Sequence, residues 1–328
     1  MEGKKKKLLL ISGNIEYIQH VGGVGMHVHR LLERLVKPEV IDYTTSDYKK
    51  EGFIAQFNKI RKADVIHLHV SNPYMRLVYV MATRLLGKKC ILTVHGNYGR
   101  FNGTKNRADK LAMKLVSVPV LINKESFEKV REFNNNAVLL PAFILPVEGE
   151  EVLSNDAKII IDRIKETGKT LFITSTNHRA FTDDGKEIYG IEFLVDYFSK
   201  QDSYQLLVLD PFSEYKQVYE GRLPDNITIL SGAYSFCGAV KMADVVVRNT
   251  PTDGDAFSVK EALWLHKPTI VTDAVSRPEG VFLFHYNDEH SFEQAIRTAL
   301  SNKEEIKLKE EDGIDGYRRL YKQIGVIA

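Results

Sequence analysis

Short apolar runs alternate with amphipathic segments along almost the whole chain, and this alternation is what most restricts its fold. In the first half, runs typical of buried strands occupy 7–12, 39–43, 64–69, 90–95, 118–122 and 137–140. Apolar residues at helical spacing occupy 25–35, 74–86 and 107–115. Strands that alternate with helices form parallel sheets covered by helices on both faces, so we predict a doubly wound α/β fold.

The alternation stops at 141–156, where two prolines precede an acidic cluster, and then starts again. Further strands are predicted at 169–174, 204–209, 227–230, 244–248 and 269–272, and further helices at 190–197, 236–242, 259–265 and 291–301. A charged helix is predicted at about 303–323. We therefore expect an N-terminal domain at 1–148, a C-terminal domain at 149–308 and a helix within 309–328 that packs back on the first domain.

Composition excludes several classes of protein. The 328 residues suffice for two domains, and a net charge of +2 gives no support to nucleic-acid binding. Cys90 and Cys237 lie beside apolar segments without metal-type spacing, so we expect reduced thiols in the core of a cytoplasmic protein. The longest apolar run, 137–147, contains Pro141 and Pro146 and is too short to span a bilayer.

The chain begins with a run of four lysines, Lys4–Lys7, before its first apolar segment. That segment is too short for a signal peptide and is followed by loop residues. The lysines are expected to lead from solvent into the first strand, and they also fit a weak peripheral contact with the inner face of a membrane.

The segment 248–263 carries the most chemical information. It joins a predicted buried strand to a predicted helix, with acids at Asp253, Asp255 and Glu261. A helix N-terminus offers unpaired N–H groups and a positive dipole end, which favour phosphate. A carboxylate one turn further on can accept hydrogen bonds from sugar hydroxyls. The combination predicts a nucleotide-sugar ligand.

Five motifs, in order and spacing, resemble the retaining glycosyltransferases of family 4. They are Gly-Gly-Val-Gly-Met-His-Val at 22–28, Asp-Val-Ile-His-Leu-His at 64–69, Ile-Leu-Thr-Val-His-Gly at 91–96, the acids Asp253 and Glu261 with seven residues between them, and Lys-Pro-Thr-Ile-Val-Thr-Asp at 267–273. The likeness covers nearly the whole chain. It implies the GT-B fold, in which two Rossmann-like domains face each other across a cleft.

The resemblance implies transfer of a sugar from a UDP- or GDP-linked donor to a hydroxyl of a carbohydrate or lipid-linked acceptor, in polysaccharide or glycolipid biosynthesis. Anomeric configuration is retained, and neither metal nor cofactor is needed. By position, His95 lies beside the reacting sugar, Asp253 contacts its hydroxyls and Glu261 holds the ribose. Further donor-binding positions implied by the resemblance or its context are Gly22, Gly23, Gly25, Arg179, Lys186, Tyr234, Asp255, Phe257, Ser258 and Val259.

The chain also departs from the family pattern. Its first acid is Asp253 where the family has glutamate, and Asp255 adds a negative charge close to a diphosphate. The phosphate-clamping cations are represented by Arg179 and Lys186 at altered spacing, and Tyr189 stands before the following glycine. These departures bear on donor affinity and on activity.

Four other functions fit parts of the sequence. The altered cation segment also fits a catalytically impaired GT-B protein that only binds nucleotide-sugars. A nucleotide-sugar epimerase or a phosphorylase would share the fold. The glycines at 22–25 with Asp42 imitate the fingerprint of an NAD-dependent oxidoreductase, but Val28 takes the place of its third small residue. His67 and His69 share one face of a strand without an evident third ligand, so no metal site is predicted.

Overall fold

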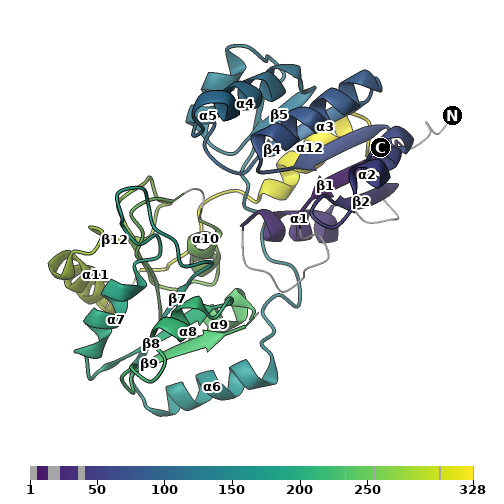
Figure 1. The fold of residues 1–328 in the computed structure, drawn as a ribbon. Helices are drawn as coiled ribbons and strands as arrows, with labels where there is room; N and C mark the ends of the chain where they lie inside the picture. Colours follow the sequence, from purple (N-terminus) through teal and green to yellow (C-terminus); the bar gives the residue numbers. More distant parts are fainter. Residues whose placement is uncertain are drawn as a thin grey trace. The chain divides into compact units, whose positions relative to one another are not determined.

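The computed structural model describes residues 6–13, 23–35, 41–232, 234–253, 256–302 and 304–327, and the chain forms two compact units. The first unit contains the elements up to Val147 together with the C-terminal segment Glu311–Ala328. The second unit contains the elements of Glu148–Glu310 (Figure 1). Among the described residues, no helix combines the length and apolar character needed to cross a membrane.

The first unit is built on a six-stranded parallel sheet. Its strands are β1 (Leu8–Ser12), β2 (Tyr43–Asp47), β3 (Val65–His69), β4 (Lys89–Val94), β5 (Val118–Leu121) and β6 (Val138–Leu139). Its helices are α1 (Gly23–Arg34), α2 (Phe53–Lys62), α3 (Pro73–Leu85), α4 (Gly103–Leu115), α5 (Lys124–Arg131) and α12 (Gly313–Gln323). The strand order β2-β1-β3-β4-β5-β6 reverses direction between β1 and β3. Such a switch point, at the carboxyl ends of the strands, is where open α/β sheets bind ligands.

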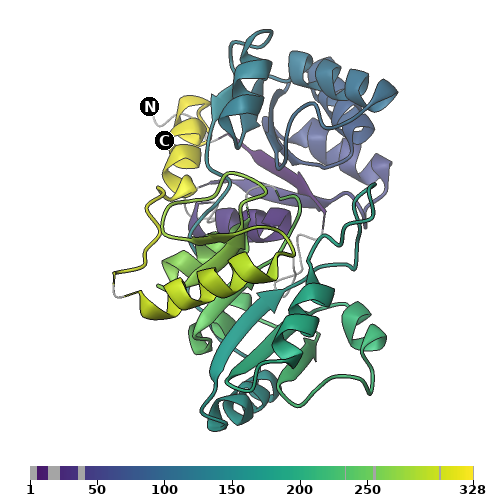
Figure 2. The ribbon, with the colours of Figure 1, turned by 90° about the vertical axis from the view of Figure 1, so that its left-hand side faces the viewer.

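Successive residues of β1 point to opposite faces of this sheet. Leu8 and Leu10 pack with α1 and α12, whereas Leu9 and Ile11 pack with α2, α3, α4 and α5. Helix α12, in yellow in Figures 1 and 2, therefore belongs to the core of the first unit although it lies at the other end of the sequence.

The second unit repeats this architecture with a different strand order. Its strands are β7 (Thr170–Ser175), β8 (Tyr204–Asp210), β9 (Ile227–Ser231), β10 (Val245–Arg248), β11 (Thr269–Thr272) and β12 (Phe282–Phe284). Its helices are α6 (Asn155–Glu166), α7 (Ile191–Ser199), α8 (Glu214–Val218), α9 (Phe236–Met242), α10 (Phe257–Trp264) and α11 (Glu289–Ser301). The parallel sheet runs β12-β11-β10-β7-β8-β9 and reverses between β7 and β10. This is the strand order of dinucleotide-binding Rossmann domains.

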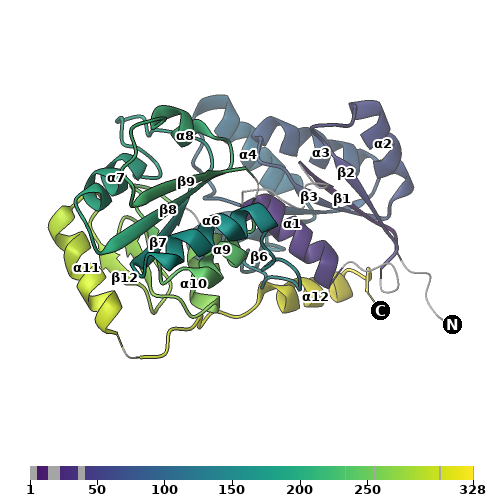
Figure 3. The same ribbon diagram turned by 90° about the horizontal axis from the view of Figure 1, so that it is seen from below.

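Both faces of the second sheet are covered by helices (Figure 3). Phe172 of β7 packs on one face with α7 and α11, and its neighbours Leu171 and Ile173 pack on the other with α6, α9 and α10. Cys90 and Cys237 are buried and not joined in a disulfide, as predicted for reduced core thiols. The predicted doubly wound α/β architecture is confirmed.

Two predicted elements are corrected. The second strand occupies Tyr43–Asp47, not 39–43, of which 39 and 40 lie outside the described residues. The predicted helix at 303–323 begins only at Gly313, because Asp312 caps α12 by accepting a hydrogen bond from Ile314 N–H at 3.1 Å. Residues 304–312 before it are not helical, and Ile306 and Leu308 pack against Val259 and Leu263.

Candidate functional site

The switch point of the second sheet brings two loops together at the carboxyl ends of β7 and β10. The side chain of Asn249, just after β10, donates a hydrogen bond to the carbonyl of Gly190 at 3.1 Å. Gly190 has a φ of +53°, and a Cβ there would collide with the Asn249 side chain, so glycine is required. The guanidinium of Arg248 lies over the ring of Tyr189, 5.8 Å from its centroid. The loop that carries the predicted cations is thus held against the loop that carries the predicted acids.

Asp253 lies between two arginines at this edge. Nε and Nη2 of Arg248 donate to its two carboxylate oxygens at 2.6 and 3.0 Å, and Nη1 of Arg277 donates to Oδ2 at 2.8 Å. The Arg277 side chain is only 4% exposed and that of Asp253 7%. A carboxylate with a two-pronged guanidinium on one side and a second guanidinium on the other is a strongly fixed group.

The charges around Asp253 determine its protonation. Burial alone would raise the pKa of the Asp253 carboxyl, but the attraction and hydrogen bonds of Arg248 and then Arg277 outweigh burial and hold the pKa below its usual value. The carboxylate is therefore ionised at neutral pH. In this structure its acceptor oxygens are directed at protein cations, which gives Asp253 a structural role in the loop.

Glu261 lies in the second turn of α10 and is 5% exposed, so it does not point into bulk solvent. Single ligand atoms of Glu261, Cys237 and Glu150 lie within 4.8 Å of one another. The α9 residue Cys237 and the loop residue Glu150 thus flank the Glu261 carboxylate. The geometry makes Glu261 a buried, positioned carboxylate near the start of α10.

The N-cap residue of α10 is Ala256, whose methyl side chain cannot accept a capping hydrogen bond. Phe257 and Val259 bury their side chains, whereas Ser258 is partly exposed. The N–H of Val259 donates to the Ala256 carbonyl at 3.2 Å, so this predicted phosphate donor is engaged within the first turn. Asp255 lies outside the described residues.

The two cations predicted to clamp the diphosphate are engaged in local ion pairs. Nη2 of Arg179 contacts Glu192 at 2.8 Å, and Nζ of Lys186 contacts Asp184 at 2.8 Å. The Lys186 and Asp184 side chains are 54% and 61% exposed. Neither pair belongs to the ion cluster around Asp253. Exposed ion pairs of this kind contribute little to the free energy of unfolding, so each cation can readily exchange its acidic partner for another anion.

Tyr234, predicted to lie near a nucleotide base, is partly buried beside the core under α9. Its ring folds over Gly232, whose φ is +110°. A Cβ on Gly232 would lie 3.3 Å from the Tyr234 hydroxyl oxygen, so glycine permits the close approach.

The predicted glycine loop is in part helical. Gly23 and Gly25 already belong to the first turn of α1, while Gly22 lies outside the described residues. A Cβ added to Gly25 would meet nothing within 4 Å, so the packing of the chain does not require glycine at this position. Open space at a glycine near a switch point leaves room for a ligand to approach the backbone.

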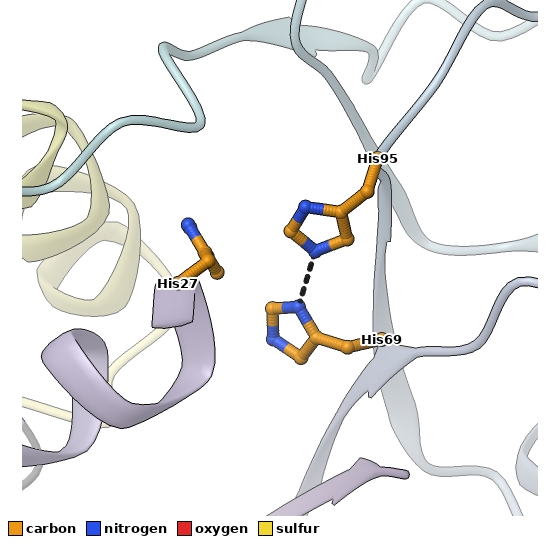
Figure 4. A group of neighbouring side chains, drawn as sticks. All are labelled: His27, His69 and His95. Atoms are coloured by element: carbon orange, nitrogen blue, oxygen red, sulfur yellow. Dashed lines mark hydrogen bonds between the residues drawn. The ribbon is translucent and has the colours of Figure 1, made fainter. Parts of the chain in front are cut away.

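Three histidine side chains meet at the switch point of the first sheet (Figure 4). His27 comes from α1, His69 ends β3 and His95 follows β4. Nδ1 of His69 and Nε2 of His95 are 2.9 Å apart, and Nδ1 of His27 lies 2.6 Å from the carbonyl oxygen of Ala142. The His27 ring centroid lies 5.2 Å from that of His69 and 4.8 Å from that of His95.

Burial keeps these rings neutral. It lowers the pKa of His27 to about 4, although the hydrogen bond to Ala142 partly opposes the shift. Burial, reinforced by neighbouring rings, also lowers the pKa values of His69 and His95 well below the usual value. The site predicted around His95 is therefore a group of neutral imidazoles at pH 7.

His67 differs from its neighbour His69. Its Nδ1 lies 2.6 Å from the Tyr321 hydroxyl and its Nε2 lies 2.8 Å from the Thr93 hydroxyl. Both ring nitrogens are thus satisfied inside the protein, which makes His67 a structural residue that joins β3 to β4 and α12.

Sequence reasoning missed Arg248, Arg277 and His27. Arg248 ends β10 directly before the predicted loop, so its position offered a usable signal. Arg277 follows β11 and reaches Asp253 only through tertiary structure. His27 lies within the glycine motif, but nothing in the linear spacing joins it to His69 and His95.

Comparisons with known proteins identify the fold. No protein-family model and no curated protein sequence matches the chain. Among solved structures, HepE of Anabaena in complex with UDP-glucose is 11% identical to this chain with a TM-score of 0.67. The superposition covers 98% of this chain and 96% of the HepE chain. Sucrose-phosphate synthase of Thermosynechococcus elongatus is 15% identical with a TM-score of 0.60, covering 98% and 97%.

A candidate UDP-N-acetylglucosamine 2-epimerase of Listeria monocytogenes is 15% identical with a TM-score of 0.64, covering 97% of this chain and 96% of its own. The fold is thus shared by glycosyltransferases and by an epimerase-like protein. The predicted GT-B fold is confirmed, and at these identities the likeness establishes the fold alone.

Proposed function

We propose that this protein is a retaining glycosyltransferase that moves a sugar from a nucleotide-diphospho-sugar to an acceptor hydroxyl. One observation carries the proposal: Asp253 precedes the start of α10 and Glu261 is buried in its second turn, at the switch point of a sheet with Rossmann strand order. Such an edge binds phosphates through amides and the helix dipole. Two solved structures of the same fold, HepE in complex with UDP-glucose and a sucrose-phosphate synthase, support the same interpretation.

In the proposed reaction, the donor binds to the second unit. The diphosphate faces the start of α10, and Glu261 accepts hydrogen bonds from the ribose. Arg179 and Lys186 exchange their exposed acidic partners for the diphosphate and stabilise the negative charge that grows as the sugar–oxygen bond breaks. Tyr234 lies near the base. Gly22, Gly23 and Gly25 let the backbone approach the donor.

The resemblance also assigns His95 to the reacting sugar, where a neutral imidazole can donate its one N–H to a sugar oxygen. The acceptor hydroxyl attacks from the face that the leaving group occupies, and a diphosphate oxygen takes its proton. Configuration at the anomeric carbon is retained. Protein cations, in place of a metal ion, stabilise the negative charge on the leaving diphosphate.

The test begins with a thermal-shift screen of UDP-, GDP-, ADP- and CMP-linked sugars. A ligand that binds only the folded protein raises its Tm, and we expect UDP- or GDP-sugars to do so. Product made with a set of acceptors is then examined by NMR for the anomeric configuration, with and without EDTA. Retention without metal supports the proposal. Inversion, or strict dependence on added metal, contradicts it.

The epimerase-like neighbour makes nucleotide-sugar epimerisation the second candidate function. An epimerase changes the sugar of its donor without any acceptor. Incubating the donor alone and following its sugar by NMR separates the two functions. Donor binding with neither transfer nor epimerisation would instead identify a nucleotide-sugar-binding protein.

For the acceptor, we propose a lipid-linked carbohydrate reached from the inner face of a membrane by a cytoplasmic, peripherally associated protein. On α3, the side chains of Tyr74, Val78, Met81 and Leu85 recur at helical spacing and are all at least 40% exposed. The adjacent helix α4 adds Leu111, and the two helices expose basic residues but no acid (Arg84, Lys105, Arg107, Lys110 and Lys114). An apolar stripe bordered by cations fits an anionic bilayer.

Replacing Leu85 by glutamate is expected to weaken binding to vesicles containing phosphatidylglycerol at least severalfold, because the change puts a negative charge into the stripe. Leu85 is 82% exposed, so folding should be unaffected. The control is Val152→Glu, at a 71% exposed position in the second unit. Flotation measures binding. Equal flotation of both variants and the parent protein would show that this surface does not contact the bilayer.

A further inference from the structure

The histidine cluster at the first switch point has properties that sugar binding does not require. One ring nitrogen from each of His27, His69 and His95 lies within 4.8 Å of the other two. Nε2 of His27 and Nε2 of His69 are buried and have no hydrogen-bond partner among the residues that the structure describes. Buried polar atoms are nearly always satisfied, so two orphaned imidazole nitrogens in one cluster require an explanation.

The tautomer of His27 is fixed by its backbone partner. The Ala142 carbonyl can only accept a hydrogen bond, so Nδ1 of His27 carries the proton and donates it across 2.6 Å. The orphaned Nε2 therefore holds a lone pair. A histidine that binds a metal usually donates its other ring N–H to a carbonyl or carboxylate in this way, which orients the ring.

His69 and His95 supply the remaining nitrogens. The contact of 2.9 Å between Nδ1 of His69 and Nε2 of His95 requires one proton between them. An ion that replaces this proton would bind Nδ1 of His69 and Nε2 of His95. The displaced proton moves to the other nitrogen of the ring that carried it, so both imidazoles stay neutral and no net proton is released. Around a tetrahedral zinc ion, nitrogens are about 3.3 Å apart, so small ring rotations suffice to close the cluster.

We propose that His27, His69 and His95 form a binding site for one transition-metal ion of the Zn²⁺ class, with the fourth coordination position open. Three neutral imidazoles select zinc, cobalt, nickel or copper over magnesium and calcium, which prefer oxygen ligands. The ion would be bound by a ring nitrogen of His95 and by Nε2 of His27. It would thereby withdraw His95 from the donor sugar and inhibit transfer.

Binding of the ion is independent of the proposed function, whereas inhibition of transfer rests on it. The primary experiment is therefore direct titration of untagged, metal-free protein with Zn²⁺ in competition with a chromophoric chelator. Co²⁺ serves as a spectroscopic probe, because tetrahedral coordination gives intense visible absorption. We expect one ion per chain and tetrahedral Co²⁺ absorption.

Variants locate the site. His95→Ala changes a partly exposed side chain and should weaken Zn²⁺ binding at least a hundredfold. His27→Asn keeps a donor for the Ala142 carbonyl and should do the same. The matched control, His290→Ala, removes an exposed histidine of α11 and should bind like the parent. Cys237→Ser tests the separate group formed by Glu150, Cys237 and Glu261 and should also leave binding unchanged.

Zinc that still binds one to one in both folded His95→Ala and His27→Asn proteins would overturn the proposal, as would a dissociation constant in the millimolar range for the parent. In transfer assays, Zn²⁺ should inhibit the parent and spare His27→Asn. Absence of any transfer would contradict the proposed function while leaving the titration decisive for the metal site.

Discussion

Glu261→Gln is expected to lower donor affinity or turnover at least about tenfold. Glu261 is 5% exposed, and its carboxylate has a fixed position near the start of α10. A hydrogen bond to a charged acceptor contributes roughly 1.5–3 kcal/mol, and about 1.4 kcal/mol corresponds to a factor of ten. Glutamine has nearly the same shape but is a weaker acceptor, so the loss would report the charge and not the packing. Isothermal titration and steady-state kinetics measure it.

The matched control is Glu220→Gln, which neutralises an exposed glutamate of the same unit. It should leave the donor affinity and the Tm unchanged. A folded Glu261→Gln protein with parental kinetics would remove Glu261 from the donor site. Both substitutions remove one negative charge, so a difference between the two variants cannot result from the change in net charge.

The sequence predicted the architecture because buried parallel strands and amphipathic helices each leave a periodic apolar pattern. It could not give the strand order, because order depends on pairing between segments far apart, such as β1 with β3 or β7 with β10. Short polar helices such as α5 also lack the pattern. The predicted start of the last helix was wrong because the charged residues of 304–312 favour a helix, whereas Ile306 and Leu308 instead pack against Val259 and Leu263 of α10.

The sequence can indicate a residue's place where it directly follows a strand or begins a helix, but it cannot indicate which distant residues that side chain contacts. Glu261 was expected near a helix start and is buried there. Arg277 could not be recognised as a partner of Asp253 because helix α10 and strand β11 separate the two residues in the sequence. The histidine cluster shows the same limit: His67 and His69 are neighbours on one strand, yet only His69 meets His27 and His95.

Asp253→Ala is expected to destabilise the second unit by about 3–5 kcal/mol, a larger effect than that of most surface substitutions. The change leaves the guanidiniums of Arg248 and Arg277 facing each other without their carboxylate, and unpaired buried charge is costly. Urea unfolding followed by fluorescence measures the loss. Asp225→Asn, at an exposed position, is the control.

The same carboxylate predicts a pH dependence. The pKa of Asp253 is lower in the folded protein than the value of about 3.9 expected when unfolded, so its stabilisation is complete above roughly pH 5. It is lost as the pH falls through the folded pKa, where the native carboxylate takes up its proton. Asp253→Asn should therefore differ most from the parent at neutral pH and converge with it in acid. A constant difference across the acid range would show that the charge is not what stabilises the loop.

A double-mutant cycle separates this structural role from sugar binding. If Asp253 mainly neutralises Arg277, the Asp253→Asn/Arg277→Gln protein should be more stable than the sum of the two single losses predicts. The reason is that the Arg277 guanidinium, left without its carboxylate by the first substitution, is removed by the second. Its donor affinity should recover in parallel. If Asp253 instead contacts the sugar, as its position in the acid pair implies, stability should recover in the double variant while donor affinity stays low. Unfolding and titration on the same four proteins decide between these outcomes.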